Sequence, residues 1–402
     1  MLIKNKIINH IEKLFLLSPL LVILMVIFNF SDSKFILSRL IPIIAIYCLL
    51  KYREAIRANW NSVLRSFFIS GLLIIVIFSG YHFFRGDEFS LPRTLIVSLV
   101  YLLFVPWNKI SSQWVYYIAA LASVICGLNA LYEHFVMNIA RVGIATNPIP
   151  YALYASFLLL CCVYLLLNQS DKILKAIAAM GGLLSLTAII MTDVRGVVLF
   201  LPVVILYLMI ATVKPTVKHY IVLCFSICAI SVLFYAIFDQ EIDARIEQTR
   251  YEFSMIEKGK HHTSIGIRLD LWKHGLDVIA HDPIFGLGDD ALEKSIASIN
   301  NRRAAVQPHL HNQYLDSLAR YGVVGTLVML LCCFALIVNF TRSGVKYIGN
   351  PLVNSMLIML MLAGLTDVPL HHTHLIYLLT ILCGLLILFS EIGKDKNRHL
   401  FK

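Results

Sequence analysis

Charged side chains are scarce in this chain. Asp, Glu, Lys and Arg make up 14% of the 402 residues, against about 25% in soluble globular proteins. Hydrophobic residues make up 59%, and the mean hydropathy is +0.78. Apolar runs of roughly 18 residues recur along the whole length, and each can cross about 30 Å of hydrocarbon as a helix. This composition excludes a soluble globular domain and indicates a polytopic membrane protein.

The chain also lacks strict alternation of apolar and polar residues, which is the pattern of transmembrane β-strands. The sequence therefore predicts an all-α integral membrane protein with about twelve transmembrane helices. We expect the spans at about 14–30, 35–50, 67–82, 93–107, 114–132, 149–168, 176–193, 196–213, 220–238, 321–340, 352–367 and 375–391.

Cysteine pairs of the Cys-x-x-Cys type are absent. All nine cysteines lie within apolar runs, at Cys48, Cys126, Cys161, Cys162, Cys224, Cys228, Cys332, Cys333 and Cys383. This placement excludes a disulfide framework in the loops and a thiolate metal site. We interpret the cysteines as small, polarisable residues of the helix core.

The net charge of +10 comes from short segments between apolar runs. That placement is typical of topology signals and argues against nucleic-acid binding. With the N-terminus inside, the inner segments carry eighteen Lys and Arg residues and the short outer segments carry six, so we expect both termini in the cytoplasm. Lys4, Lys6 and Lys13 precede a long run without an obvious cleavage site, and the first helix is therefore expected to remain as an anchor.

One polar island interrupts the apolar sequence at 239–320. A connection of this length between spans is usually functional. The predicted organisation is transmembrane helices 1–9 over 1–238, a large outward-facing loop over 239–320, and transmembrane helices 10–12 with a cytoplasmic tail over 321–402. The loop would face the periplasm in a Gram-negative cell.

Amphipathic helices are predicted in this loop. Four apolar residues of 268–280 recur at helical spacing and would lie on one stripe, namely Leu269, Trp272, Leu276 and Ile279. Residues 283–288 read as a compact turn, and 311–320 as a short helix leading into the tenth span. Such helices would lie on the outer membrane face and cover the bundle.

Two arginines are candidates for binding an anion. Arg195 lies between two apolar runs with almost no loop, and a charge at the bilayer centre costs about 2.5 kcal/mol or more. Its planar guanidinium would suit a phosphate group, and the alternatives are an ion pair with Asp193 or snorkelling to the headgroups. Arg268 lies at the start of the predicted loop helix, where the helix dipole disfavours a cation. It either serves an anionic ligand or is a solvated loop residue.

Histidine is concentrated at the end of the island. His311 is a candidate general base because neutral imidazole accepts a proton near neutral pH, and a structural role is the alternative. His309 and Asn312 stand beside it. Gly322 and Gly325 follow at the start of the tenth span, where small residues would allow close helix packing.

Asp367 lies at the predicted outer end of the eleventh span. It would orient a histidine or hold an arginine, and the alternative is an ordinary acid at a helix end. His371, His372 and His374 follow in the same short turn. No Cys or Glu accompanies them, and adjacent histidines rarely bind one ion, so no metal site is predicted.

These residues resemble the motifs of the O-antigen ligase family of bacterial envelope enzymes, within the superfamily of O-antigen ligases and polymerases. The family signature is His, then Asn, Ser or Gln, then nine residues, then Gly-x-x-Gly. His311, Asn312, Gly322 and Gly325 match it without a gap.

Further motifs match in the same order along about 190–370. They are Arg-x3-Leu at Arg195–Leu199, Gly-x-Arg-Leu at Gly266–Leu269, Pro-x-x-Gly-x-Gly at Pro283–Gly288, and the acid near the last outer turn at Asp367. One departure is Leu327, where many members have an aromatic residue.

The resemblance implies a membrane glycosyltransferase of GT-C-like architecture, a lipid A–core:surface polymer ligase. It would move O-polysaccharide from undecaprenyl diphosphate to a sugar hydroxyl of lipid A–core, with inversion and without a metal or other cofactor. Arg195, Arg268 and His311 would be catalytic, the arginines acting on the diphosphate and the histidine on the acceptor hydroxyl. Asp367 or Asn312 would fix the imidazole tautomer. The residues expected to bind substrate are Arg195, Arg268, His309, Asn312, Gly322, Gly325 and Asp367.

The implied partners are the lipid-linked glycan donor, the lipid A–core acceptor and membrane lipids. The implied location is the bacterial inner membrane, with the active site facing the periplasm. An O-antigen polymerase or a protein O-oligosaccharyltransferase would use the same donor, and both stay open as alternatives. A transporter would show paired discontinuous spans and midplane charges, whereas the charges here cluster at the predicted outer edge.

Overall fold

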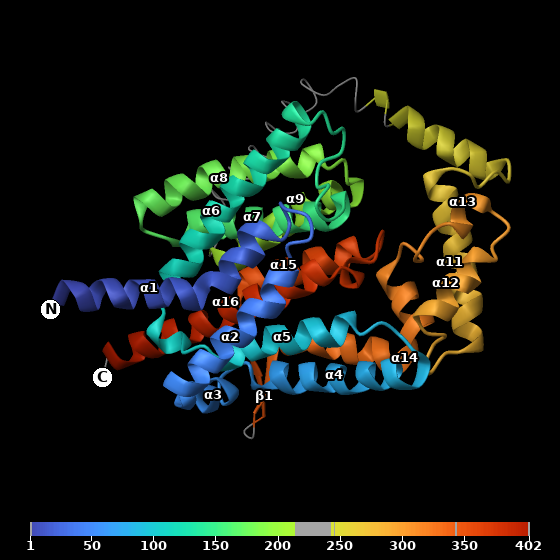
Figure 1. The fold of residues 1–402 in the computed structure, drawn as a ribbon. Helices are drawn as coiled ribbons and strands as arrows, with labels where there is room; N and C mark the ends of the chain where they lie inside the picture. Colours follow the sequence, from blue (N-terminus) through green and yellow to red (C-terminus); the bar gives the residue numbers. More distant parts are fainter. Residues whose placement is uncertain (1, 214–242, 245, 342–343, 401–402) are drawn as a thin grey trace.

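The computed structural model describes the chain at 2–213, 243–244, 246–341 and 344–400, with 2–7 and 392–400 as backbone only. These residues form a long helical bundle with a separate group of short helices at one end (Figure 1). Both termini lie at the other end of the bundle. The predicted topology requires this separation of the polar island from the termini.

The bundle consists of α1 (Leu2–Leu21) continued by η1 (Val22–Val26), α2 (Phe35–Lys51), α3 (Arg53–Trp60), α4 (Arg65–Arg85), α5 (Ser90–Phe104), η2 (Trp107–Lys109), α6 (Ser112–Leu131) continued by η3 (Tyr132–Val136), α7 (Pro148–Asn168), α8 (Lys172–Met191), α9 (Arg195–Thr212), α14 (Gln313–Ala335), α15 (Pro351–Ala363), η4 (Pro369–His371) and α16 (Thr373–Leu400). The separate group consists of α11 (Ser264–His281), α12 (Asp289–Ala297) and α13 (Arg302–Ala305). The strands are β1 (Val338–Thr341) and β2 (Gly344–Tyr347).

Eight helices of the described residues are long and apolar enough to cross a membrane, or nine if α2 and α3, bent by 104°, count as one span. Helices α5 and α15 are shorter and also apolar. Every predicted span overlaps one of these helices except 220–238, which lies outside the described residues. The prediction of a multi-pass helical membrane protein is thus confirmed, and the count of twelve crossings stays a prediction.

The centre of the bundle is formed by α7 and α16, which bury 78% and 83% of their apolar windows. Helix α7 begins at Asn147, whose side chain accepts a hydrogen bond from the Ile149 amide, and Pro148 occupies the first turn. Beyond that turn the helix is apolar on all sides, as a central helix must be. Close approach of α6 and α8 depends on small residues, since a Cβ on Gly181 would lie 2.8 Å from Cβ of Ser123.

The chain is not entirely α-helical, and the predicted end of the tenth span at 340 is wrong. Helix α14 stops at Ala335, and β1 then pairs with β2 in an antiparallel hairpin. Ser66 fixes β1, because its hydroxyl donates to Oδ1 of Asn339 (2.6 Å) and accepts from the Phe340 amide (2.7 Å). Hydropathy continues across this boundary, so the helix end could not be seen in the apolar run.

The polar island folds into a helical group with a core of its own, here called the loop unit (α11, α12 and α13). Its core and the adjoining start of α14 bury Leu271, Val278, Leu292, Ile296, Ala304, Leu310 and Ala319. The predicted helix at 268–280 is confirmed within α11. The predicted stripe is right for Trp272 and Ile279, which pack against this core, and wrong for Leu269 and Leu276, which are exposed. Leu271, Gly275 and Val278 face the core instead. Leu310 packs on Gly275. This face of the helix was missed by the sequence analysis because a glycine has no apolar side chain and does not contribute to a hydrophobic periodicity.

A main-chain interlock joins the loop unit to the bundle. Gly322 interrupts α14 with a φ of 62°, and residues 283–288 pack against this break. Four hydrogen bonds hold them there: Val323 N–H to Pro283 O (2.9 Å), Val324 N–H to Ile284 O (3.2 Å), Leu287 N–H to Ala319 O (2.8 Å) and Gly288 N–H to Arg320 O (2.8 Å). The Pro-x-x-Gly-x-Gly motif therefore pairs directly with the Gly-x-x-Gly motif.

Replacing Gly322 by alanine should break this interlock. The left-handed φ is unfavourable for a residue with a Cβ, and that Cβ would overlap the carbonyl group of Ile284. We expect a loss of about 2 kcal/mol or more in the free energy of unfolding, measured as a lower unfolding temperature in detergent. Gly259→Ala is the control, since its φ is 68° but its Cβ would meet nothing within 4 Å. Equal losses in both variants would show that the steric contact is unimportant.

Candidate active site

The seam between the loop unit and the bundle brings the candidate residues together. Arg195 is the first residue of α9, and its Nη2 donates to Oε1 of Gln248 (2.9 Å), in the helix that precedes α11. Gly196 lies so close to Thr366 that a Cβ would be 2.5 Å from the threonine hydroxyl oxygen. The start of α9 therefore contacts both the loop segment and the turn that carries Asp367.

A cavity of about 550 Å³ lies beside this seam, and all of its lining residues belong to the polar island, between Gln248 and His311. Arg268 and His311 both line it, and so does Gln248, the partner of Arg195. Among the described residues the guanidinium of Arg268 has no hydrogen-bond or ion-pair partner. The cavity thus offers an anionic ligand one uncommitted cation from the loop unit and a second cation at its edge.

His311 is held between a carboxylate and an amide. Its Nδ1 is buried without a hydrogen-bond partner and lies 3.8 Å from Oδ1 of Asp367. Its Nε2 lies 3.0 Å from Oε1 of Gln307, another residue of the cavity wall. His309 Nε2 lies 3.9 Å from the same Asp367 oxygen. One carboxylate therefore faces two imidazoles, and the second nitrogen of His311 points to the cavity lining.

Asn312 fixes the backbone beside His311. Its Oδ1 caps α14 by accepting from the amides of Tyr314 (3.0 Å) and Leu315 (3.1 Å), and its Nδ2 donates to the carbonyl of Leu365 (3.3 Å). The Gln313 amide also donates to the carbonyl of Gly364 (2.8 Å). These bonds tie the start of α14 to the turn that ends at Asp367.

The charge state around His311 follows from burial. Burial lowers the pKa of His309 to about 4, and the neighbouring His311 adds to this shift. Burial opposes ionisation of Asp367, but the imidazoles of His311 and His309 outweigh it and lower the pKa of that carboxyl below its usual range. Near neutral pH the site therefore holds a neutral His309 and a charged Asp367 beside His311.

This shift of His309 predicts a loss of stability in acid. Histidine in an unfolded chain titrates near 6.5, whereas His309 in the folded chain titrates near 4. Between these values the unfolded state binds more protons, so roughly 3 kcal/mol of stability present above pH 6.5 is lost as the pH falls towards 4. His309→Gln should flatten the fall in unfolding temperature between pH 7 and 4.5, and the exposed control His281→Gln should not. An unchanged fall in His309→Gln would contradict the assignment.

Comparison with known proteins supports the resemblance to a family. A family model described as O-Antigen ligase matches residues 180–330, which include Arg195, Arg268 and His311. The chain is 23% identical over 336 residues to a protein of Escherichia coli named O-antigen ligase, covering 77% of this chain and 79% of that protein. The chain is similar to the O-antigen ligase family. It is also 24% identical over 274 residues to an uncharacterized protein of Haemophilus influenzae, covering 64% of this chain and 67% of that one.

These matches confirm the resemblance inferred from the motifs. They support an enzyme that ligates a polysaccharide in lipopolysaccharide biosynthesis.

The motifs of the O-antigen ligase family fall into two groups by position. Arg268 and His311 line the cavity, Arg195 binds its wall residue Gln248, and Asp367 and His309 lie next to His311. Gly322 and Gly325, which we expected to bind substrate, are not among the residues that line the cavity. A Cβ on Gly325 would lie 2.5 Å from Cβ of Tyr321 and 3.3 Å from the ring of Tyr81. Both glycines therefore have a packing reason for being glycine.

Within the described residues, one group of side chains could hold a metal ion. It differs from the cluster of three histidines that the sequence analysis considered as a metal site. His309, His311 and Asp367 have ligand atoms within 4.8 Å of one another, whereas His371, His372 and His374 form no such group within the described chain. Two imidazoles and one carboxylate are a donor set that Zn²⁺ accepts. The expectation that the reaction needs no metal therefore stays a prediction, and removal of metal ions by a chelator tests it.

Three polar residues of the site were missed by the sequence analysis. Gln248 binds Arg195, Gln307 contacts His311, and Arg303 lines the cavity while its Nη1 donates to the carbonyl of His262 (2.7 Å). None belongs to a motif. Gln307 precedes His311 by four residues in the polar island, and that proximity was the only sequence signal for any of them.

Proposed function

We propose that this protein transfers O-polysaccharide from undecaprenyl diphosphate to a sugar hydroxyl of lipid A–core. The observation that carries the proposal is one cavity lined by Arg268 and His311, with Arg195 bound to its wall through Gln248. Such a transfer needs a cation for the leaving group and a base for the attacking hydroxyl. Similarity to the O-antigen ligase family supports the same class of reaction.

The diphosphate is the leaving group and supplies the driving force. When the anomeric C–O bond breaks, its electron pair passes to the diphosphate oxygen and increases the negative charge there. Arg195 and Arg268 neutralise that charge, and preorganised cations contribute up to several kcal/mol once substrate excludes water from them. The position of Arg195 in the first turn of α9 adds the favourable end of a helix dipole.

His311 removes the proton of the acceptor hydroxyl. The hydroxyl takes the place of Gln307 at Nε2, and its proton passes to Nε2 while its oxygen bonds to the anomeric carbon. The carboxylate of Asp367, whose Oδ1 lies 3.8 Å from Nδ1, stabilises by its charge the imidazolium that forms. Attack from the side opposite the diphosphate inverts the anomeric configuration.

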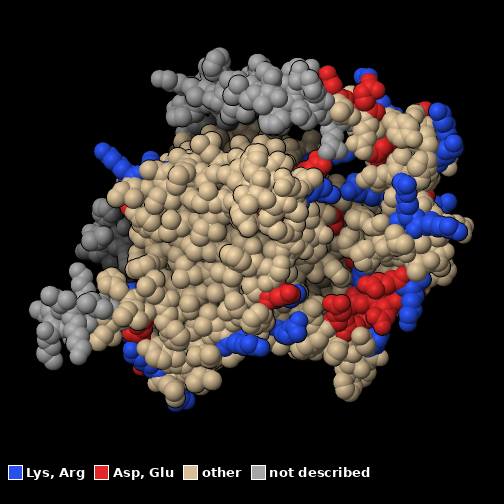
Figure 2. Space-filling model, turned by 45° about the horizontal axis from the view of Figure 1, so that its top comes forward, with Lys and Arg blue, Asp and Glu red and all other residues tan. Residues whose placement is uncertain are grey.

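The apolar face of α9 next to Arg195 provides a place for the polyprenyl tail. Val198, Leu199 and Val203 are exposed on this helix. Figure 2 shows a broad surface of the bundle almost without charge, while Lys, Arg, Asp and Glu gather on the loop unit and at the margins. A donor with a long apolar tail and an anionic head matches this division, with the tail along the bundle and the diphosphate at the seam.

The proposed location is the inner membrane, with the cavity on the periplasmic side and both termini in the cytoplasm. The excess of Lys and Arg in the segments assigned to the inside supports this orientation. Alkaline phosphatase fused within 281–288 should be active, and the same enzyme fused after Lys402 should be inactive. The opposite pattern would place the cavity in the cytoplasm.

A deletion strain examined by lipopolysaccharide gel tests the proposed acceptor. Loss of a ligase leaves long lipid-linked glycan unused and the core bare. Loss of a polymerase leaves the core capped by a single repeat, and loss of a protein glycosyltransferase leaves the lipopolysaccharide unchanged. Either of the last two patterns would reject the ligase in favour of the corresponding alternative.

The proposed reaction should not depend on a divalent metal. Two arginines replace the charge that a metal would supply at the diphosphate, so EDTA should change the transfer rate of purified protein by less than about 2-fold. Transfer abolished by EDTA and restored by Zn²⁺ or Mg²⁺ would instead assign His309, His311 and Asp367 to an ion. Phenanthroline with and without added Zn²⁺ is the matching control for a tightly held ion.

A further inference from the structure

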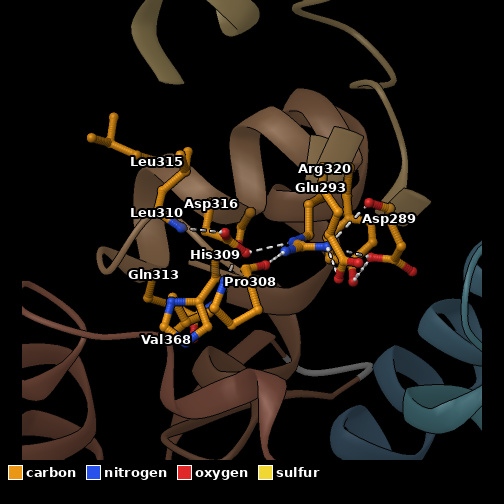
Figure 3. A network of polar contacts seen from close by, with 12 residues as sticks. Asp289, Glu293, Pro308, His309, Leu310, Gln313, Leu315, Asp316, Arg320 and Val368 are labelled. Carbon is orange, nitrogen blue, oxygen red and sulfur yellow. Dashed lines mark hydrogen bonds and ion pairs between the residues drawn. The ribbon is translucent and has the colours of Figure 1, made fainter. Parts of the chain in front are cut away.

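We propose that Arg320 and Asp316 are positioning residues that hold His311 in its working place. This inference rests on the proposed function of His311 as the base. Both residues lie in α14 between the histidine and glycine halves of the family signature, at positions that the signature leaves open. Figure 3 shows them at the centre of a network that reaches α12 and the segment before α14.

Arg320 is a fully buried charge with partners on three sides. Its Nε donates to Oδ2 of Asp316 (2.8 Å), its Nη1 lies 3.3 Å from Oδ1 of Asp289 on α12, and its Nη2 donates to the carbonyl of Pro308 (2.6 Å). Removing a guanidinium from water costs several kcal/mol, and apolar side chains often stabilise such a position equally well. Stability alone therefore does not account for an arginine here.

The two residues fix the backbone on both sides of His309. Arg320 holds the carbonyl of Pro308, and Oδ1 of Asp316 accepts the amide of Leu310 (3.0 Å) while its Oδ2 binds Arg320. One guanidinium and one carboxylate thus clamp residues 308–310 onto α14. We call this arrangement the 308–310 clamp.

His311 follows the clamp in a conformation that needs support. Its φ is 48°, in the left-handed region that costs a residue with a side chain about 1 kcal/mol or more. Its own side-chain contacts are weak, because Nδ1 is 3.8 Å from Asp367 and Gln307 has to leave Nε2 when the acceptor binds. The 308–310 clamp before His311, together with the Asn312 cap after it, therefore determines where Nε2 lies during the reaction.

Conservative variants separate positioning from folding. Arg320→Lys keeps the charge but loses the planar fork, and Asp316→Asn keeps an acceptor for the Leu310 amide but loses the charge opposite Arg320. Because a displacement of about 1 Å at a reacting group lowers rates by up to ~100-fold, we expect kcat to fall ~10- to 100-fold in folded protein. KM for the lipid-linked donor should stay within about 2-fold. Amide hydrogen exchange of the peptide 306–312 should accelerate, while that of α11 should not.

Arg85→Lys is the matched control. Arg85 donates to the carbonyls of Phe285 (2.7 Å), Gly286 (3.0 Å) and Arg320 (3.3 Å) and pairs with Asp87. It therefore also ties the loop unit to the bundle, but it meets Arg320 only at the main chain and contacts neither the guanidinium nor the Asp316 carboxylate that hold residues 308–310. It should lower the unfolding temperature and leave kcat and the exchange of 306–312 unchanged.

Three results would overturn the positioning role. They are wild-type exchange of 306–312 in both clamp variants, accelerated exchange with unchanged kcat, and equal loss of kcat in Arg85→Lys and Arg320→Lys. Hydrogen exchange does not depend on transfer, so a wild-type protein that transfers no glycan would reject the proposed function while the exchange data still report on the clamp.

Discussion

His311→Gln should lower glycan transfer by ~10²- to 10⁴-fold, which is the usual contribution of a positioned general base. Glutamine preserves the approximate volume and a hydrogen-bonding group but cannot take up a proton. The buried Nδ1 beside Asp367 and the Nε2 beside Gln307 give the imidazole one nitrogen to orient and one to react. The measurement is single-turnover transfer by protein in nanodiscs, with lipid-linked glycan and lipid A–core supplied in excess.

Two further histidine variants make this result specific. His309→Gln removes an imaginable substitute base next to the same carboxylate, but the low pKa of His309 makes it a poor proton acceptor near neutral pH, so we expect a loss below about 10-fold. His281→Gln, on the exposed end of α11, should have no effect. Transfer by His311→Gln within about 3-fold of wild type would remove His311 from the mechanism.

The positions of the apolar helices could be predicted because a helix that crosses a lipid bilayer needs apolar residues along its whole length. The predicted end of the tenth span and the predicted buried face of α11 failed because contacts between distant parts of the chain decide them. The end of a continuous apolar run becomes β1, which pairs with β2 and is hydrogen-bonded by Ser66, far away in the chain. Gly275 faces the core of the loop unit because Leu310 fills the space beside it, and no periodicity of apolar residues contains that information.

The candidate site was predictable in part for a related reason. A charge in an apolar run is unfavourable, so Arg195 was visible at once, and His311 and Arg268 could be found through the family's motifs. Gln248 and Gln307 could not be found, because polar residues are ordinary in a polar island. Their importance arises only when the loop unit brings them to Arg195 and His311.

In this chain the geometry gives the histidine half and the glycine half of the signature different roles. Gly322 receives the 283–288 turn and so fixes the loop unit to α14. Asp316 and Arg320, in the helix between the two halves, hold the segment before His311. The nine residues between the halves thus form one rigid connection from the interlock to the proposed base.

Arg268→Ala should lower transfer by ~10²- to 10³-fold, as expected when one preorganised charge is lost from a developing anion. The main effect should be on kcat, because charge on the diphosphate grows as the C–O bond breaks. Arg268→Lys should recover only part of the loss, since an ammonium group cannot bind two oxygens with a planar fork. Lys273→Ala, an exposed cation on the same helix that does not line the cavity, should retain full activity.

The double variant Arg195→Ala/Arg268→Ala tests whether the two cations act on one diphosphate. Residues that act on the same charge are coupled, so the loss in the double variant should differ from the product of the single losses by 10-fold or more, an interaction of about 1.4 kcal/mol. Two arginines that serve different ligands would give multiplicative losses. Equal loss in Lys273→Ala would reduce the effect of Arg268 to the general positive charge of the loop unit. In that case the proposed leaving-group role would fall to Arg195 alone.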